Sequence, residues 1–244
     1  MHWFRKKELM GGLMRIIFVR HGHPNYVDDC LTELGKLHAQ AAAERLKNEG
    51  IGQIFSSTCG RAYETAECTA NLLGLSIEKC DFMGEIRWGI LRDNQIVADE
   101  DPWGLSDAMV RRNESLLCSD WKETDPFSQN VMIGYVNRIA GETDRWLQTL
   151  GYQREGLYYR VTGEKSATER TIAAFGHGGA SAAILSHMFN LPYPFVCTTM
   201  GLDYTGITVV SLSDEEGELI TPRFELLNDA RHILGLQTKN EYAC

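Results

Sequence analysis

Two histidines stand beside glycine, each at the end of a short apolar run. His21 follows the run MRIIFV at residues 14–19, with Arg20 between them, and His177 follows TIAAFG at 171–176. Short runs of β-branched and small apolar residues predict buried strands, and parallel strands in particular. Glycine carries no Cβ and lets backbone N–H groups approach an anion. Because α/β sheets place their sites at the carboxyl ends of strands, both histidines are candidates for a functional site.

Cationic groups are predicted to lie close to both histidines. Arg20 immediately precedes His21, and a guanidinium presents a planar pair of donors that matches a phosphate. Arg61 falls in the first turn of a helix predicted over residues 59–73, where the helix N-terminus adds partial positive charge. The backbone of Gly178 is expected to contact the same anion. The pattern indicates a phosphate-binding site.

Strands and helices alternate along most of the chain. We predict strands over 14–19, 53–56, 157–161, 171–175, 206–212 and 219–226. We predict helices over about 32–48, 59–73 and 130–150, and a further helix that follows residues 176–180 and runs through Met188. The last two strands are expected at the edge of the sheet. This alternation predicts an α/β fold, a three-layer helix–sheet–helix sandwich with a mostly parallel central sheet.

The first predicted helix has a good N-cap residue in Thr32. Its apolar stripe is expected to consist of Leu34, Leu37, Ala41 and Leu46. We place His38 on the solvated face of this helix. In the second helix the small residues Ala62, Ala66 and Ala70 would allow close packing on the sheet.

Residues 92–130 form the least regular stretch of the sequence. We interpret them as an inserted cap with one or two short helices, within a single domain that spans residues 14–244. Residues 1–13 are interpreted as an N-terminal extension. The side chains of the cap that are expected to grip an anionic substrate are Trp103, Arg111, Arg112, Trp121 and Phe127.

The composition excludes several classes of partner. The formal net charge is -9, from 24 basic and 33 acidic residues, which disfavours binding to nucleic acid or to an anionic membrane. No apolar run approaches the ~20 residues needed to span a bilayer, and the N-terminal segment is too polar for a signal peptide. The seven cysteines form no C-x-x-C pair and no zinc-site spacing, so we expect free thiols in a cytoplasmic protein. The sequence leaves a homodimer open.

Several segments together resemble the histidine phosphatase superfamily, which includes the phosphoglycerate mutases. The matching segments are RHG at 20–22, LTELG and QA at 31–41, SSTCGRAYETA at 56–66, EIRWG at 85–89, HGG at 177–179 and NDARHI at 228–233. The resemblance runs from about residue 14 to 234 and is weakest across 92–165. The chain departs from the pattern at His23, where many members carry glutamate.

The resemblance implies a mechanism that proceeds through a phosphorylated histidine. His21 would attack phosphorus as a neutral ring and become transiently phosphorylated. Arg20, Arg61 and His177 would hold the phosphate oxygens, and Glu85 would give a proton to the leaving oxygen and then take one from water. No metal or other cofactor is expected, because two guanidiniums supply the positive charge.

Among the site residues that the resemblance implies, Glu85 has the most alternatives of the same type close by in sequence. Other carboxylates close to Glu85 in sequence are Glu78, Asp81, Asp93, Asp99, Glu100 and Asp101.

We therefore expect a metal-independent phosphomonoester hydrolase that acts on a small phosphorylated metabolite. A phosphoglycerate mutase would use the same chemistry, and the phosphatase is favoured because residues 92–165 carry no mutase-like substrate contacts that we recognise. Two further alternatives are a metal hydrolase, in which His21 and His23 form a ligand pair, and a non-catalytic phosphate-binding module. The sequence does not specify the substrate.

Overall fold

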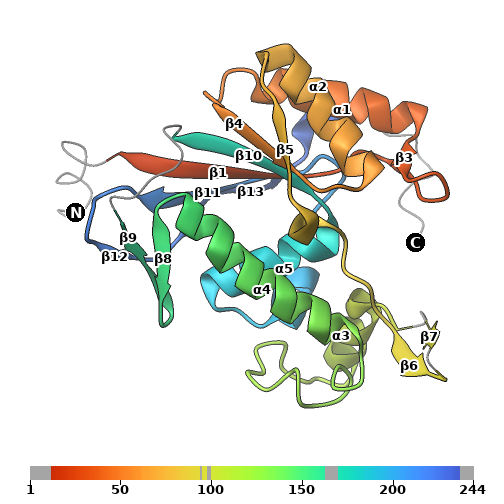
Figure 1. The fold of residues 1–244 in the computed structure, drawn as a ribbon. Helices are drawn as coiled ribbons and strands as arrows, with labels where there is room; N and C mark the ends of the chain where they lie inside the picture. Colours follow the sequence, from red (N-terminus) through yellow and green to blue (C-terminus); the bar gives the residue numbers. More distant parts are fainter. Residues whose placement is uncertain (1–11, 94, 98–99, 163–169, 237–244) are drawn as a thin grey trace.

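The structure is a computed structural model that describes residues 12–93, 95–97, 100–162 and 170–236 (Figure 1). Most of the N-terminal extension interpreted from the sequence therefore lies outside the described residues, and Leu13 already belongs to the first strand.

A six-stranded sheet forms the centre of the fold, in the order β13-β11-β1-β10-β4-β5. Its strands are β1 (Leu13–Arg20), β4 (Gln53–Ser56), β5 (Ile77–Lys79), β10 (Thr171–Gly176), β11 (Ile207–Ser213) and β13 (Arg223–Asp229). The four strands from β1 to β5 in this order are parallel, and β11 runs antiparallel to both of its neighbours. The predicted mostly parallel sheet is confirmed.

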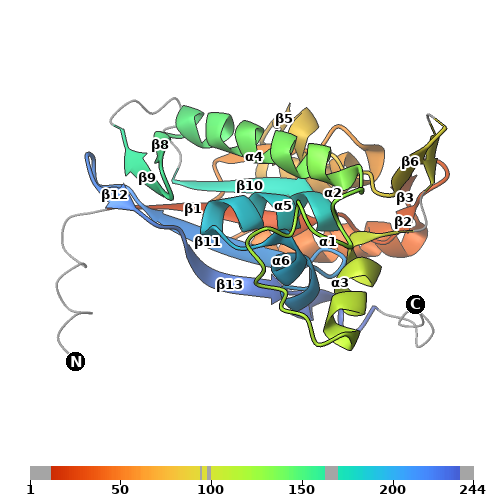
Figure 2. The ribbon, with the colours of Figure 1, turned by 90° about the horizontal axis from the view of Figure 1, so that it is seen from below.

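Helices cover both faces of this sheet (Figures 1 and 2). Helices α1 (Glu33–Leu46) and α2 (Gly60–Leu73) lie on one face, and α4 (Met132–Thr149), α5 (Gly178–Phe189) and α6 (Tyr193–Thr199) lie on the other. Strand β1 is buried on both sides, because Ile17 belongs to the core beneath α1 and α2 whereas Ile16 belongs to the core beneath α4 and α5. The predicted three-layer sandwich is confirmed.

Helix α1 begins as predicted but buries a different face. The Thr32 hydroxyl accepts a hydrogen bond from the Gly35 N–H at 3.1 Å. The predicted stripe is confirmed at Leu46, which is buried, but wrong at Leu37, which is 47% exposed. His38, placed on the solvated face, is only 1% exposed. The buried side consists of Gly35, His38, Ala39, Ala42, Ala43 and Leu46. Most of these residues are glycine or alanine, which let α1 lie close to the elements beneath it. Close packing therefore decides which face of α1 is buried more than side-chain hydrophobicity does.

The C-terminal strands depart from the expectation in two ways. Strand β11 is an interior strand, and β13 alone occupies the edge beside it. The strand predicted over 219–226 is divided: β12 (Leu219–Ile220) joins β8 (Tyr152–Glu155) and β9 (Tyr158–Val161) in a small separate sheet. Pro222 lies at the break, and proline has no N–H for a continuous ladder. The polar sequence of β8 gave no strand signal.

The ends of the sheet differ in what surrounds them. The carboxyl end of β1 faces the hairpin of β2 (Pro24–Asn25) and β3 (Cys30–Leu31), the hairpin of β6 (Ile90–Arg92) and β7 (Gln95–Val97), and α3 (Pro102–Arg111). Figure 2 shows the small sheet of β8, β9 and β12 at the opposite end. Two 3₁₀ helices, Asp81–Met83 and Arg231–Ile233, complete the described elements.

The described part of the predicted cap contains one α-helix, α3, with Asp101 as its N-cap residue and Pro102 in its first turn. In the part of the chain that the structure describes, no helix is long and apolar enough to cross a membrane.

Candidate active site

Strand register brings the two histidines together. Strands β1 and β10 are parallel neighbours with Arg20 opposite Gly176, and the residues that follow them are His21 and His177. The His21 N–H donates to the carbonyl of Gly176 at 2.9 Å. The two imidazole rings meet edge to face with their centroids 5.1 Å apart.

His21 is buried and neutral. Its Nδ1 lies 2.7 Å from the Gly22 carbonyl oxygen, and only 1% of the residue is exposed. A carbonyl can only accept, so Nδ1 carries the proton and Nε2 keeps its lone pair. Burial, followed by the charges of Arg20 and Arg61, lowers the pKa of His21 to about 3. The ring is therefore unprotonated, as a nucleophile must be.

Glycines fix the loop that carries His21. A Cβ on Gly22 would lie 2.6 Å from the carbonyl oxygen of Gly35, and a Cβ on Gly35 would collide with the carbonyl oxygen of His23. The Gly22 N–H donates to the Thr65 hydroxyl at 3.0 Å. The start of α1 and the histidine loop thus pack backbone to backbone, which requires glycine at both positions. The Thr65 side chain connects α2 to the same loop.

His177 lies between a serine and an arginine. Arg61 Nη2 donates to His177 Nδ1 at 3.0 Å, so Nε2 carries the proton and donates to the Ser57 hydroxyl at 2.9 Å. Burial is the largest cause that lowers the pKa of His177 to about 2, with further contributions from His21, Arg61 and Arg20. His177 is therefore neutral and can donate a hydrogen bond without adding charge.

The two arginines are held by different partners. Arg20 donates to the carbonyl of Leu202 at 2.6 Å and lies over the Tyr204 ring, 4.5 Å from its centroid. Arg61 forms an ion pair with Asp29 and lies over the ring of Tyr26. The Nε atoms of both arginines are buried and have no hydrogen-bond partner in the described structure. Buried N–H groups normally have a partner, so these two are suited to the oxygens of an anion.

Glu85 lies beside the same site, with its carboxylate against the N-terminus of α5. Its carboxylate accepts the N–H groups of Ala180 at 2.9 Å, Ile86 at 3.0 Å and Gly179 at 3.3 Å. A Cβ on Gly179 would lie 2.7 Å from the carboxylate, so glycine is needed there. Burial raises the pKa of Glu85, although the three N–H groups and Arg20 oppose this effect. A raised pKa suits a carboxyl group that must donate a proton near neutral pH.

The rival carboxylates are placed less favourably. Glu78, Asp81 and Asp93 are exposed, and Asp101 accepts from Gly104 as the N-cap of α3. Asp99 lies outside the described residues. Glu85 is the candidate among these acids that lines the cavity described next.

A cavity of about 780 Å³ opens over these groups. Four residues of the candidate site, Arg20, Arg61, Glu85 and Gly178, line it. The remaining lining residues are Tyr26, Trp88, Trp103, Ala182, Cys197, Thr198, Met200, Gly201, Leu202 and Asp203. A volume of this size is typical of small-molecule sites and far exceeds what a phosphate ion needs.

The cap contributes less to this cavity than the sequence suggested. Of the five side chains expected to grip the substrate, Trp103 lines the cavity. Trp121 and Phe127 are buried against each other, with ring centroids 5.4 Å apart, and Arg111 and Arg112 are exposed. The prediction was wrong for these four, because the aromatic pair anchors the loop to the core and the arginines point to solvent.

Two contacts were missed by sequence reasoning. The Asp29 carboxylate pairs with Arg61 and accepts the Gly60 N–H at 2.8 Å. Tyr204 packs against Arg20 and lies 5.9 Å from His21, centroid to centroid. Tyr204 lies far from the motifs in sequence, and Asp29 lies between two of them, at 20–22 and 31–41, but belongs to neither. Ser57 lies within one of the motifs and could have been identified.

The pair of histidines that suggested a metal site has other partners. His21 Nδ1 contacts the Gly22 carbonyl, and His23 Nδ1 lies 2.9 Å from the Thr32 hydroxyl. Within the described ranges, no three histidine, cysteine or carboxylate side chains gather in a way that could hold a metal ion.

The fold is α/β, and two arginines and two neutral histidines gather at the carboxyl end of its parallel strands. A sequence model of the histidine phosphatase superfamily (branch 1) matches residues 16–115 of the chain.

Comparisons with individual proteins agree with this match. The chain is 29% identical to the "probable phosphoglycerate mutase GpmB" of Yersinia pestis over 122 residues, which cover 43% of this chain and 57% of that protein. Its fold is similar to that of a mycobacterial glucosyl-3-phosphoglycerate phosphatase, with 23% identity, a TM-score of 0.60, and coverage of 88% of this chain and 99% of the other.

A phosphoserine phosphatase from Entamoeba histolytica gives a TM-score of 0.59 at 16% identity, with 90% and 99% of the two chains covered. The match to the curated relatives thus spans little more than half of their length, and the two solved structures share the fold.

Proposed function

We propose that the protein is a phosphomonoester hydrolase that acts on a small phosphorylated metabolite through a phosphohistidine at His21, without a metal ion. The observation that carries the proposal is the state of the His21 ring. The ring is neutral, Nδ1 is bonded to the Gly22 carbonyl, Nε2 keeps its lone pair, and the charges of Arg20 and Arg61 help to hold the pKa of His21 low.

The reaction has two balanced steps. In the first, His21 Nε2 forms a bond to phosphorus while the bond from phosphorus to the leaving oxygen breaks, and Glu85 gives its proton to that oxygen. In the second, water attacks phosphorus, Glu85 takes a proton from the water, and the bond to Nε2 breaks to release phosphate. Arg20 and Arg61 stabilise the charge on the phosphoryl oxygens in both steps.

His177 has a separate role in this proposal. Its proton is directed to Ser57 and its other nitrogen to Arg61 in the free protein. Because the ring is neutral, it orients Arg61 without adding a positive charge that would compete for the phosphate. The Asp29 carboxylate holds the same guanidinium from the other side.

The relatives support a second candidate, a phosphoglycerate mutase, because the curated relative named above carries that description. A mutase would return the phosphoryl group to a second hydroxyl, and a phosphatase gives it to water. A non-catalytic phosphate-binding module would do neither.

A panel of phosphorylated metabolites, assayed for phosphate release with and without EDTA, tests the proposal. We expect release that survives EDTA. Interconversion of 2- and 3-phosphoglycerate without phosphate release would favour the mutase, binding without turnover would favour the module, and activity that vanishes with EDTA and returns with one divalent cation would contradict metal independence.

A cytoplasmic location is part of the proposal. It is supported by the six described cysteines, all of which are free thiols, as expected in a reducing compartment. Fractionation of cells that express the chain would test it, and recovery in a secreted fraction would contradict it.

A further inference from the structure

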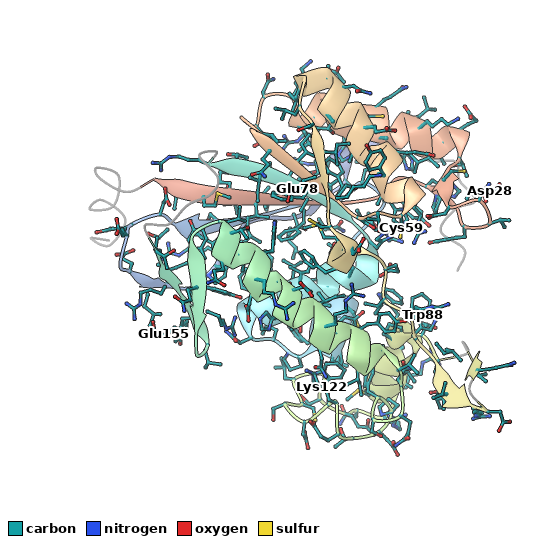
Figure 3. All side chains as sticks on the ribbon, viewed as in Figure 1. Asp28, Cys59, Glu78, Trp88, Lys122 and Glu155 are labelled. Atoms are coloured by element: carbon teal, nitrogen blue, oxygen red, sulfur yellow. The ribbon has the colours of Figure 1, made fainter. Side chains whose placement is uncertain are left out.

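The part of the cavity beyond the arginines has an aromatic wall. Trp103 belongs to α3. Trp88 comes from the segment that leads to β6 and is labelled in Figure 3, where it lies beside α3. The two indole rings meet edge to face, with centroids 5.8 Å apart and an interplanar angle of 88°. Trp103 remains 36% exposed and both rings line the cavity. Each ring therefore supports the other and leaves apolar surface open to a ligand.

This aromatic wall lies directly beside Arg20, one of the two arginines proposed to bind the phosphoryl group. A Cβ added to Gly178 would lie 3.6 Å from the guanidinium carbon of Arg20 and 3.8 Å from the indole ring of Trp103. The guanidinium and the indole are thus neighbours of one backbone position. A phosphoryl group bound by Arg20 would therefore lie next to the indole of Trp103.

The charges along the cavity limit what that leaving group can be. Among the lining residues that the structure describes, the cations are Arg20 and Arg61, and both are engaged by the phosphoryl group in the proposed function. The acids are Glu85 and Asp203, and Asp203 is exposed on the rim. A second anionic group on the substrate would meet no free cation there and would be repelled by Asp203.

We propose that this cavity selects phosphomonoesters whose leaving group presents a flat apolar face and carries no second negative charge. The inference rests on the proposed hydrolase function and deepens it. Trp88 and Trp103 supply the face against which the leaving group stacks, and the shortage of cations excludes carboxylated phosphoesters of the phosphoglycerate type.

Four phosphate esters test the charge and the stacking separately. Phenyl, 2-naphthyl, 4-(hydroxymethyl)phenyl and 4-carboxyphenyl phosphate have phenol leaving groups of similar acidity, so differences in kcat/KM report recognition. We expect 4-carboxyphenyl phosphate to be hydrolysed about tenfold less efficiently than the neutral 4-(hydroxymethyl)phenyl ester. The 2-naphthyl ester should exceed phenyl phosphate by about threefold or more, because its face is larger.

Variants on α3 assign the effect to the wall. Trp103→Ala should lower kcat/KM for 2-naphthyl phosphate about tenfold more than that for ethyl phosphate, and Trp103→Phe should recover most of the difference. Val110→Ala is the matched control, because Val110 is an exposed residue of the same helix and does not line the cavity.

Two results would overturn the inference. Equal kcat/KM for the carboxylated and hydroxymethyl esters would remove the charge argument, and equal losses on naphthyl and ethyl phosphate in Trp103→Ala would remove the stacking argument, while hydrolysis itself would still support the proposed function. No hydrolysis of any of the esters by the intact chain would contradict the proposed function, and the inference with it.

Discussion

Replacing Glu85 by glutamine separates the proposed acid role from a structural one. The Glu85 Oε1 atom accepts from Ile86 and Ala180, and Oε2 accepts from Gly179 at 3.3 Å. A glutamine carbonyl oxygen can keep the first two hydrogen bonds. Its amide NH₂ faces the Gly179 N–H and loses the third, which is the longest of the three. Loss of one such bond costs about 1 kcal/mol of stability.

The catalytic cost should be far larger and should depend on the leaving group. General acid catalysis contributes about 10²- to 10⁴-fold, so kcat/KM for ethyl phosphate should fall by that amount in Glu85→Gln. 4-Nitrophenyl phosphate has a leaving oxygen that barely needs a proton, and its loss should stay below about tenfold. The assay compares both esters at about pH 6, with urea unfolding as the check on folding. Equal losses on both esters would refute the acid role of Glu85.

Two further predictions concern stability and its dependence on pH. Gly22→Ala should lower the free energy of unfolding by about 1–3 kcal/mol, because the added Cβ meets the backbone carbonyl oxygen of Gly35 at 2.6 Å. Gly134→Ala in α4 is the control, because the space around Gly134 is open, and it should not lower the free energy of unfolding. Equal effects of the two substitutions in urea unfolding would contradict the packing argument. The pKa values of His21 and His177 are lowered from 6.5 to about 3 and about 2, so the unfolded chain gains protons below about pH 6.5 that the folded chain does not bind. Stability should therefore decrease by about 1.4 kcal/mol per pH unit for each histidine as the pH falls towards 5, and His177→Gln should reduce this slope; an unchanged slope in that variant would contradict the neutral state of His177.

Much of the site could be predicted because it lies at the ends of buried strands. Apolar runs mark β1 and β10, and the carboxyl ends of parallel neighbours must meet at one edge of the sheet. This geometry explains why His21 and His177, 156 positions apart in the chain, have rings in contact. The glycines in the same segments follow from close backbone contacts, as the crowding around Gly22 and Gly35 shows.

What could not be predicted depends on tertiary contacts that leave no local pattern. Helix α1 exposes Leu37 and buries His38, whose ring lies 6.4 Å from that of Tyr204, centroid to centroid, across a long separation in the chain. Trp121 and Trp103 look equivalent in sequence, yet one anchors a loop in the core and the other lines the cavity. Asp29 reaches Arg61 only because a hairpin returns the chain to the start of α2.

The phosphorylated histidine is the central claim, and trapping it is the most direct test. Brief incubation with a substrate that carries labelled phosphate, followed by an alkaline quench and peptide mapping, should show acid-labile, alkali-stable label on His21. His23→Gln, which changes the neighbouring histidine, should retain the label, and His21→Ala should lose both label and turnover. Label that persists in His21→Ala, or full activity of that variant, would contradict the account.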